Sequence, residues 1–386
     1  MRSKRLYVFL GTVMASILLL AGCGNLKNSN ISSSGTKSTT TKSGYQTTGQ
    51  SNSSMYEGLI ENGKYKTSAA RGLTVSQDSN TYNVKSFESG LLTLSKKEFS
   101  TQDYIFQEGQ KITKTMGEAW LGRQSSSDPN GLNPKSNGKT GETTRNPIYI
   151  QQIEEQDFVQ QNGSKYNLGG ISVGIGLNKT DYYTKKAYGS TYQTDIPTDT
   201  MVAKGKEAAN KVVKRLRAKK SVGNDVPILI GLYQLAPQDS LVGGTYIYYG
   251  VAAKGSDKIT SWHKLNEANY SLPAVEDEKT GSSGDATAFS NFKTNIQSFF
   301  PNLSGVTAQT HYEDGKLKGM NITINTQFYG ETEIMSFTQY VATAANKYLP
   351  SGVDIEINIK TVQGEQAFLA RTATQKKFYS HVFGSY

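Results

Sequence analysis

The reactive side chain with the most informative surroundings is Cys23, the only cysteine among the 386 residues. It follows Leu20-Ala21-Gly22, at the end of a segment that begins with Arg2, Lys4 and Arg5 and continues as an apolar run. A sole thiol cannot form an internal disulfide, so any covalent chemistry it performs involves another molecule. A basic start, an apolar stretch and small residues before a cut are the layout of an export signal. We therefore expect cleavage before Cys23 and modification of its thiol.

Leu20-Ala21-Gly22-Cys23 resembles the lipobox of bacterial lipoproteins. That resemblance implies that lipoprotein diacylglyceryl transferase attaches a diacylglycerol to Cys23 and that signal peptidase II recognises Leu20, Ala21 and Gly22. Residues 1–22 are then the signal peptide, and residues 23–55, which contain few sizeable apolar groups, are expected to form a disordered tether. The alternative is an uncleaved membrane anchor, but the apolar run over residues 6–22 falls short of the roughly 20 residues that span a bilayer. The expected location is the extracellular face of the cell membrane, with the covalent lipid in place of any cofactor.

The composition describes a soluble body with a mild positive charge. Hydrophobic residues make up 36% of the chain, and the formal net charge is +10. Loss of Arg2, Lys4 and Arg5 with the signal leaves 39 basic against 32 acidic residues, or about +7. At a bacterial surface such a charge favours an anionic wall polymer or lipid head groups as partners. Nucleic acid is excluded as a partner because the chain is addressed outside the cytoplasm.

Two further patterns could support catalysis or metal binding. Gly170-Ile171-Ser172-Val173-Gly174 matches the G-x-S-x-G nucleophile elbow, but Ser172 lies within an alternating strand pattern rather than at a sharp strand-to-helix turn. His263, His311 and His381 each stand alone, without the spacing of zinc ligands. We therefore expect no catalytic residue, no metal site and no enzyme. A hydrolase that uses Ser172 is kept as an alternative, and it requires an exposed serine beside a histidine.

Clustered charges are interpreted as solvated surface groups rather than as catalytic or metal-binding sites. Acidic residues occur as Glu154-Glu155 with Asp157, as Glu276-Asp277-Glu278, and as Glu331 with Glu333. None of these groups has the pattern of a calcium-binding loop. The end of a helix expected over residues 200–220 carries five cations, which suit the helix dipole and are expected to face solvent. The alternative for this basic cluster is contact with teichoic acid or phospholipid; its members are Lys214, Arg215, Arg217, Lys219 and Lys220.

Hydrophobic periodicity predicts an α+β fold. A strand, a helix, a strand and a further strand are expected in sequence, and a strand–helix–strand unit then recurs nearer the C-terminus. The first set covers residues 170–178, 200–220, 227–235 and 245–253, and the second covers 318–329, 333–348 and 353–362. The recurrence indicates an internal duplication or, equally, a coincidence of a common element. One or two packed lobes are expected, with a first lobe over 56–270 and a second over 271–386.

Short stretches from residue 56 to residue 362 resemble, in the same order, the CamS family of sex-pheromone precursor lipoproteins of Gram-positive bacteria. Their order along the chain is more specific than any one of them. The stretches are Ala70-Arg71-Gly72, Phe87-Glu88-Ser89-Gly90-Leu91-Leu92, Leu94-Ser95-Lys96, Tyr104, Gly109-Gln110, Gly131-Leu132-Asn133-Pro134, Glu155-Gln156-Asp157-Phe158, Tyr329-Gly330, Thr338-Gln339-Tyr340-Val341 and Ala345-Asn346-Lys347-Tyr348.

The resemblance implies an α+β body and two products from one precursor. The anchored body starts at Cys23, and a hydrophobic peptide of about seven residues is trimmed from the released signal peptide and acts between cells. By position this peptide is Ser16-Ile17-Leu18-Leu19-Leu20-Ala21-Gly22. It is uncharged apart from its termini, which suits passage through membranes. The alternative function is a binding lipoprotein that captures a peptide, a sugar or an anionic wall polymer between two lobes, in a cleft lined by tyrosines.

Overall fold

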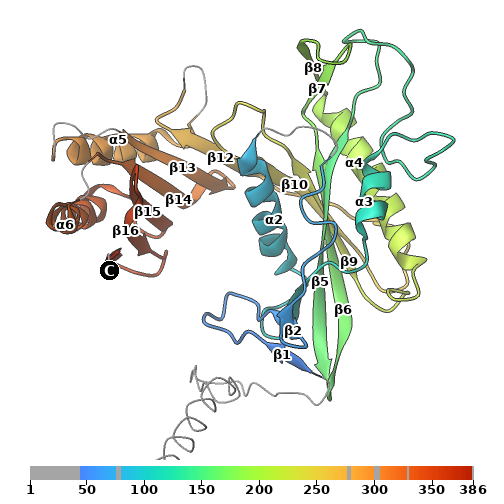
Figure 1. Cartoon of the computed structure of the whole chain (residues 1–386), viewed down its shortest axis with the longest axis horizontal. Coiled ribbons are helices and arrows are strands. Elements are labelled where there is room, and N and C mark those ends of the chain that lie inside the picture. Colours follow the sequence, from blue (N-terminus) through green and yellow to red (C-terminus); the bar gives the residue numbers. More distant parts are fainter. Residues whose placement is uncertain (1–43, 75–79, 276–279, 300–304, 328–329, 385–386) are drawn as a thin grey trace, which may run out of the picture.

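The computed structural model describes residues 44–74, 80–275, 280–299, 305–327 and 330–384. Within these residues the chain forms two lobes that lie side by side, each built on a six-stranded mixed sheet (Figure 1). A small three-stranded sheet and a two-stranded hairpin extend the first lobe at its two ends (Figure 1). The small sheet contains β1 (Tyr45–Thr47), β2 (Leu59–Glu61) and β3 (Lys64–Tyr65), and the hairpin contains β7 (Thr180–Thr184) and β8 (Thr191–Asp195).

The large sheet of the first lobe is covered by helices on both faces. Its strands, in spatial order, are β4 (Ile105–Glu108), β5 (Ile150–Asn162), β6 (Lys165–Leu177), β9 (Ile228–Gln234), β10 (Thr245–Ala252) and β11 (His263–Lys264). Only β6 and β9 are parallel, and α4 (Thr198–Arg217) connects them. One face packs against α4 and α3 (Lys114–Leu121), and the face turned toward the second lobe packs against α2 (Thr81–Ser95) (Figure 1).

The sheet of the second lobe is covered on one face. Its strands, again in spatial order, are β12 (Glu267–Leu272), β13 (Gly305–Glu313), β14 (Lys316–Asn325), β15 (Asp354–Thr361), β16 (Gly364–Arg371) and β17 (Tyr379–Val382). The parallel pair is β14 and β15, connected by α6 (Glu331–Tyr348). This helix packs beside α5 (Ser283–Gln297) over one face of the sheet (Figure 1).

The two lobes share one order of elements. Apart from the β7–β8 hairpin, which follows β6 in the first lobe, the elements correspond member by member: β4, α3, β5, β6, α4, β9, β10, β11 match β12, α5, β13, β14, α6, β15, β16, β17. Both sheets also place their single parallel pair at the same central position. The α+β fold with recurring strand–helix–strand units is therefore confirmed. The match extends beyond the short units seen in the sequence, which favours duplication over coincidence.

The alternation in β6 explains how its sheet is buried on both faces. Ile171 and Val173 and the alternate residues that follow them point into the core beneath α4 and are fully buried. The intervening positions are small, and aromatic rings lie directly on the backbone there. A Cβ added at Gly170 would lie 2.0 Å from Phe99 Cε1. Glycine at this position therefore allows the aromatic cluster under α2 to pack against the sheet.

The second sheet has one apolar and one polar face. In β13 and β14, the residues facing α5 and α6, such as Val306 and Ile322, are buried. Their neighbours, such as Gln309, His311 and Asn321, are only partly buried and face the other way. This alternation is usual for an antiparallel or mixed sheet that is covered on one side. The polar face remains open and is turned toward the first lobe.

The structure corrects the expected boundaries in two places. The tether expected over residues 23–55 is too long at its C-terminal end, because Tyr45–Thr47 forms β1 and pairs with Leu59–Glu61; residues 23–43 lie outside the described residues. The lobe boundary at residue 270 divides β12, whose pairing with β13 begins at Glu267. In α6, Ile334 is buried and Met335 is exposed. No helix in the described ranges is long and apolar enough to span a membrane.

Candidate functional site

The predicted lipidation and cleavage residues lie outside the described residues. This applies to Leu20, Ala21, Gly22 and Cys23 and to the candidate peptide Ser16–Gly22, as well as to the acidic run 276–278. The described residues instead present two polar features that the sequence did not identify as sites. One is a cleft between the lobes, and the other is a group of buried carboxyl groups on β5.

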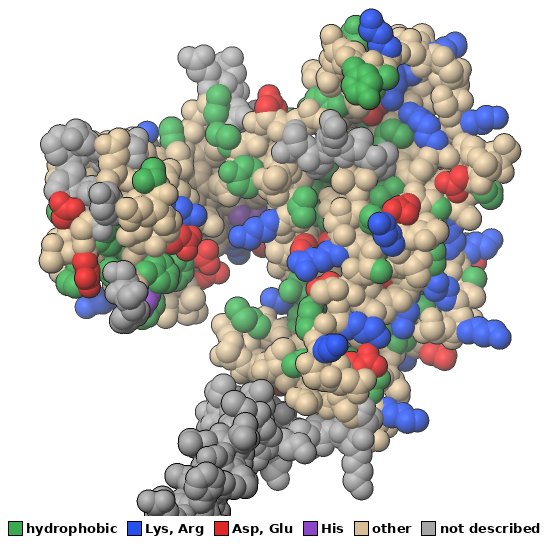
Figure 2. Space-filling model, viewed as in Figure 1, with side chains coloured by type: hydrophobic (Ala, Val, Ile, Leu, Met, Phe, Trp, Pro, Cys, Tyr) green, Lys and Arg blue, Asp and Glu red, His purple; other side chains and the backbone are tan. Residues whose placement is uncertain are grey.

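The cleft lies between α2 and the open polar face of the second sheet. It comprises two adjoining hollows of about 700 Å³ and about 340 Å³. Both are lined by Ser86 and Ser89 of α2 and by Asn269 and His311 of the second sheet. Figure 2 shows the hollow between the lobes, with basic side chains and a histidine on its walls. A volume in this range suits a bound small molecule or short polymer segment.

The two walls of the cleft carry opposite charges. The wall from the first lobe contributes four lysines, namely Lys85, Lys96, Lys97 and Lys264. The facing wall contributes five carboxylates and one lysine, namely Glu267, Glu313, Asp314, Asp354, Glu356 and Lys318. No ion pair of 4.0 Å or less joins the two walls among the described residues. These charges are therefore not held in ion pairs across the cleft, and Lys97 acts on Glu267 only at longer range.

Polar contacts join the lobes at the base of the cleft. The Asn269 amide donates hydrogen bonds to the backbone carbonyls of Gly243 and Gly244, at 2.9 and 3.0 Å. The Asn269 carbonyl accepts from His311 Nδ1, at 2.7 Å. The covalent connection between the last strand of the first sheet and the first strand of the second is only two residues long, 265–266. The lobes are thus held together by a short linker and a few hydrogen bonds rather than by an apolar interface.

Two titratable groups at the cleft have shifted pKa values. Burial, with the nearby Glu313 carboxylate, raises the pKa of Glu267 to about 7, although Lys97 opposes this shift. Burial lowers the pKa of His311 from its ordinary value, partly offset by Glu313. Both directions follow from removal of the charged form from water. Burial therefore favours the neutral forms of both Glu267 and His311 at the cleft.

The second feature is the carboxyl group of Glu155 together with that of Asp157 on β5. The Glu155 carboxylate accepts from the backbone amides of Lys111 and Ile112, the latter at 2.6 Å. Asp157 accepts from the backbone amide of Gln110, at 3.1 Å. Burial raises the pKa of both carboxyl groups, and the adjacent Glu155 raises that of Asp157 well above its ordinary value. These two groups fix the loop that precedes α3, and the expectation that they are solvated is wrong.

Stretches that carry the family resemblance converge beside this pair. Arg71 forms ion pairs with Glu88, at 3.1 Å, and with Glu108, at 3.5 Å. Glu154 lies in the same polar group, and its burial raises its pKa to about 7. The Gln156 amide donates to the backbone carbonyl of Glu88. Residues far apart in the sequence thus tie β5 to α2, and the enclosed space of about 10 Å³ leaves no room for a ligand.

The structure excludes the hydrolase alternative at Ser172. Its side chain is fully buried within β6, and its hydroxyl oxygen accepts a hydrogen bond from the Ser95 hydroxyl at 2.7 Å. No histidine takes part in this contact, since His311 bonds to Asn269 and His263 stacks on Tyr249. Among the described residues, no group of three or more histidine, cysteine or carboxylate side chains is arranged to hold a metal ion.

The basic cluster at the end of α4 is partly internal. Arg217 is buried and donates to backbone carbonyls that follow the helix and end β10, including those of Val226 and Ala252. The Arg215 guanidinium lies 5.2 Å from the ring centre of Trp120. The expectation that both face solvent is therefore wrong, because each has an internal partner. Lys214 and Lys220 are exposed, as expected.

The tyrosine expectation for the cleft is also wrong. Tyr246 and Tyr82 are the tyrosines among the described residues that line the two hollows. Tyr246 is buried and donates its hydroxyl hydrogen to the carbonyl of Phe87, so its side chain is part of the core. The cleft is lined mainly by charged groups, hydroxyls and amides. The alternation of β13 and β14 could have indicated this polar wall, but only knowledge of the lobe arrangement shows what it faces.

The fold and much of the sequence match known proteins. The family model for the CamS sex pheromone cAM373 precursor matches residues 65–377. The crystal structure of a sex pheromone precursor from Lactobacillus salivarius subsp. salivarius UCC118 is 53% identical, with a TM-score of 0.85, covering 89% of this chain and 100% of that one. The C-terminal domain of the sex pheromone staph-cAM373 precursor from Staphylococcus aureus is 29% identical, with a TM-score of 0.65, covering 80% and 98%. A search of curated proteins found no significant match. The chain belongs to the CamS family of sex pheromone cAM373 precursors.

Proposed function

We propose that the chain is a precursor that matures into a lipid-anchored surface protein and a short signalling peptide. The observation that carries this proposal is the position of the only cysteine, Cys23, directly after Leu20-Ala21-Gly22 at the end of an apolar segment. Lipoprotein diacylglyceryl transferase would modify the thiol, and signal peptidase II would cut before it. Membership of a pheromone-precursor family supports this use of the segment.

The position of the first described residues is compatible with anchoring. Gly44 and β1 lie at one end of the first lobe, away from the β7–β8 hairpin (Figure 1). Twenty residues, 24–43, connect Cys23 with this end. If they behave as a Gly/Ser-type coil, their r.m.s. reach is about 25 Å. The body would then stand clear of the membrane on its extracellular side, where its positive charge suits an anionic wall polymer.

The released signal peptide would supply the second product. Its C-terminal residues, Ser16–Gly22, contain four consecutive aliphatic side chains and no charged side chain. Apolar side chains of this kind partition favourably out of water, at about 25 cal/mol for each Å² of apolar surface. Such a peptide can cross a membrane and act on another cell.

Processing can be tested by substitution of Cys23. The full chain, expressed in a Gram-positive host, is expected to lose residues 1–22 and to carry a lipid on Cys23. Cys23→Ala should leave an unprocessed precursor, because no thiol remains to be lipidated, and globomycin should do the same in the wild type. Ser16→Ala, outside the cleavage motif, is the matched control and should mature normally. Normal maturation of Cys23→Ala would refute the proposal.

A second function for the body is ligand binding between the lobes. The observation that favours it is the interlobe cleft of about 700 Å³, whose charged walls are not paired with each other. Hydrogen exchange of the full chain can be compared with and without a tryptic peptide mixture, wall glycan fragments or glycerol phosphate polymer. Protection confined to α2 and to the β13–β14 hairpin is expected with a ligand of this site. Unchanged exchange with all three probes would count against it.

A further inference from the structure

The charges of the interlobe cleft restrict what it can hold. The α2 side presents Lys85, Lys96 and Lys97, and no acidic residue of α2 lines the cleft among the described residues. The opposite side presents Glu313 and Asp314 at the β13–β14 turn. A polyanion would meet the carboxylates, and a polycation would meet the lysines. A ligand with one charge of each sign complements both walls.

The uncharged lining groups narrow the ligand further. Thr93 and Asn266 offer a hydroxyl and an amide group that can both donate and accept hydrogen bonds, and the Ser86 and Ser89 hydroxyls, which donate to the carbonyls of Tyr82 and Lys85, offer acceptor oxygens. These match the amide groups of a peptide backbone. Aromatic platforms, on which sugars stack, are scarce, because Tyr246 is buried and Tyr82 lies at one border. The polar groups thus favour a peptide over a glycan.

We propose that the interlobe cleft binds a short peptide with free termini, its carboxylate at Lys96 and Lys97 and its ammonium group at Glu313 and Asp314. This inference rests on the second proposed function, ligand binding between the lobes, and specifies its ligand. The short linker 265–266 and the polar contacts of Asn269 allow the lobes to adjust around such a ligand. The fit does not extend to the apolar candidate peptide Ser16–Gly22, since the cleft offers it few apolar contacts.

The test uses equimolar pools of random tetrapeptides and saturation-transfer NMR on the full chain in detergent. One pool has free termini, one is N-acetylated and one is C-amidated. The free pool should show saturation transfer, and each cap should reduce it about fivefold, the factor for loss of one favourable charge pair. Absence of transfer from the free pool, or equal transfer from all three, would overturn the proposal.

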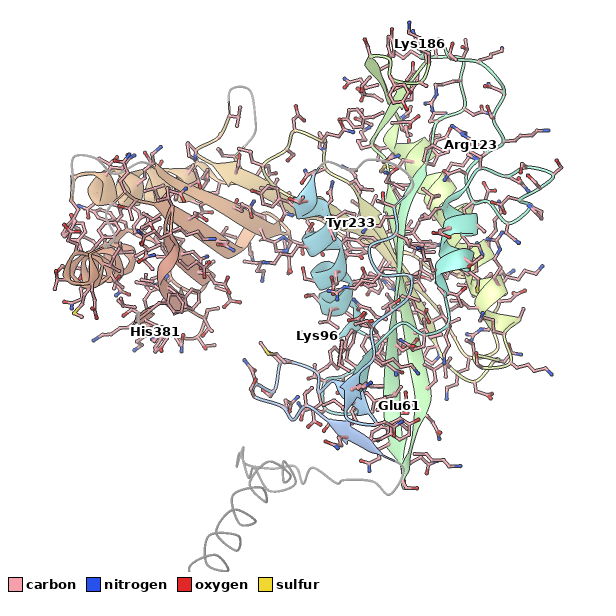
Figure 3. All side chains as sticks on the ribbon, in the orientation of Figure 1. Glu61, Lys96, Arg123, Lys186, Tyr233 and His381 are labelled. Carbon is pink, nitrogen blue, oxygen red and sulfur yellow. The ribbon has the colours of Figure 1, made fainter. Side chains whose placement is uncertain are left out.

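Paired variants assign each end of the peptide. Lys96→Gln with Lys97→Gln should abolish the difference in saturation transfer between the free and amidated pools. The same pair of substitutions should preserve the difference in saturation transfer between the free and acetylated pools. Glu313→Gln with Asp314→Asn should do the reverse; Asp314 has φ 50°, which asparagine also tolerates. The matched control is Lys185→Gln with Lys186→Gln on the distant hairpin, and Figure 3 shows Lys186 far from Lys96 at the end of α2. Variants that weaken all pools equally would contradict the assigned orientation.

Failure of the peptide proposal can be separated from failure of the binding function. Glycerol phosphate polymer and wall glycan fragments are measured in the same way. If either binds and the cleft variants remove that binding, ligand binding between the lobes stands and the peptide assignment falls. If no probe binds, both fall. Circular dichroism melting of each variant against the wild type establishes that the substitutions leave the fold intact.

Discussion

Asn269 of β12 and His311 of β13 are joined by a hydrogen bond of 2.7 Å from His311 Nδ1 to the Asn269 carbonyl oxygen. This bond orients the Asn269 amide so that its nitrogen donates to the first lobe, at the carbonyls of Gly243 and Gly244. Asn269 shares the contact between the lobes with Gln309, which donates to the Leu241 carbonyl, and with Thr245, which donates to the Glu267 carbonyl. A polar junction of this kind opens more easily than an apolar interface.

Asn269→Ala is expected to loosen this junction. Two hydrogen bonds to the first lobe are lost, each worth about 1 kcal/mol. Hydrogen exchange measured by mass spectrometry on the full chain should speed up at least about fivefold in the linker and in β12, since local opening becomes less costly. Asn130→Ala, an exposed loop asparagine, should leave these rates unchanged. Equal rates in the wild type and Asn269→Ala would show that the junction is held in another way.

Glu154 makes the stability of the first lobe depend on pH. Its pKa is about 7 in the folded protein against 4.5 for the ordinary group, because burial disfavours the charged form. A carboxyl group with a raised pKa makes a contribution to the free energy of unfolding that is fully present below pH 4.5 and is lost as the pH rises through 7. The free energy of unfolding of the wild type should therefore fall by about 3 kcal/mol between pH 4.5 and pH 8 because of Glu154, and Glu154→Gln should not show this fall.

The measurement is urea unfolding followed by tryptophan fluorescence. Trp120 and Trp262, the only tryptophans in the sequence, both pack in the core of the first lobe. Glu118→Gln is the control, since Glu118 is an exposed residue of α3 and its one ion pair within the described residues is with Lys114, at 3.8 Å. The wild type and Glu118→Gln should share one pH dependence, and Glu154→Gln should differ. Identical pH dependence in all three would contradict the assignment.

Gly170→Ala is expected to disturb the aromatic cluster beneath α2. The added Cβ would lie 2.0 Å from Phe99 Cε1, so the ring or the strand must move. Overpacking of this kind costs about 1–3 kcal/mol. Gly305→Ala is the control, because no described residue lies within 4 Å of its added Cβ and β13 begins there. Circular dichroism melts should show a lower Tm for Gly170→Ala and almost no change for Gly305→Ala, and equal melts would be inconsistent with the packing described.

Arg217→Ala is expected to destabilise the end of α4 strongly. The guanidinium donates to buried or partly buried carbonyls, those of Val226 and Ala252 among them, and these would lose their partner. Unsatisfied buried polar groups cost about 1–3 kcal/mol each, so a total loss of about 3 kcal/mol or more is predicted. Arg217→Lys should rescue only part of this, because an ammonium cannot reach the same set of carbonyls. Lys214→Ala, on the exposed side of α4, should have almost no effect on urea unfolding.

Local patterns in the sequence identified most central elements of the fold. The alternation over residues 170–178 and the apolar run over 227–235 correspond to the end of β6 and to β9. Strand β5 (Ile150–Asn162), which lies between β4 and β6, was not among the predicted elements. Its run of polar residues hides a buried strand, because the partners of the Glu155 carboxylate are the backbone amides of Lys111 and Ile112, far away in sequence.

The proposed lipidation site at Cys23 and the proposed binding site between the lobes differ in how they could be found. The first is a contiguous motif, so four adjacent residues are enough to predict it. The second is made by α2 and the β13–β14 hairpin, which are separated by about two hundred residues of sequence. No local pattern relates Lys96 to Asp314. Only the placement of the two lobes brings these opposite charges to the same cleft.

The central claim is that one precursor gives an anchored body and a peptide that ends at Gly22. Mass spectrometry of the culture medium from cells expressing the full chain tests it most directly, with the Cys23→Ala strain measured in parallel. The wild type is predicted to release Ser16-Ile17-Leu18-Leu19-Leu20-Ala21-Gly22, and Cys23→Ala to release none. A wild type that matures fully at Cys23 but yields no peptide ending at Gly22 would contradict the claim.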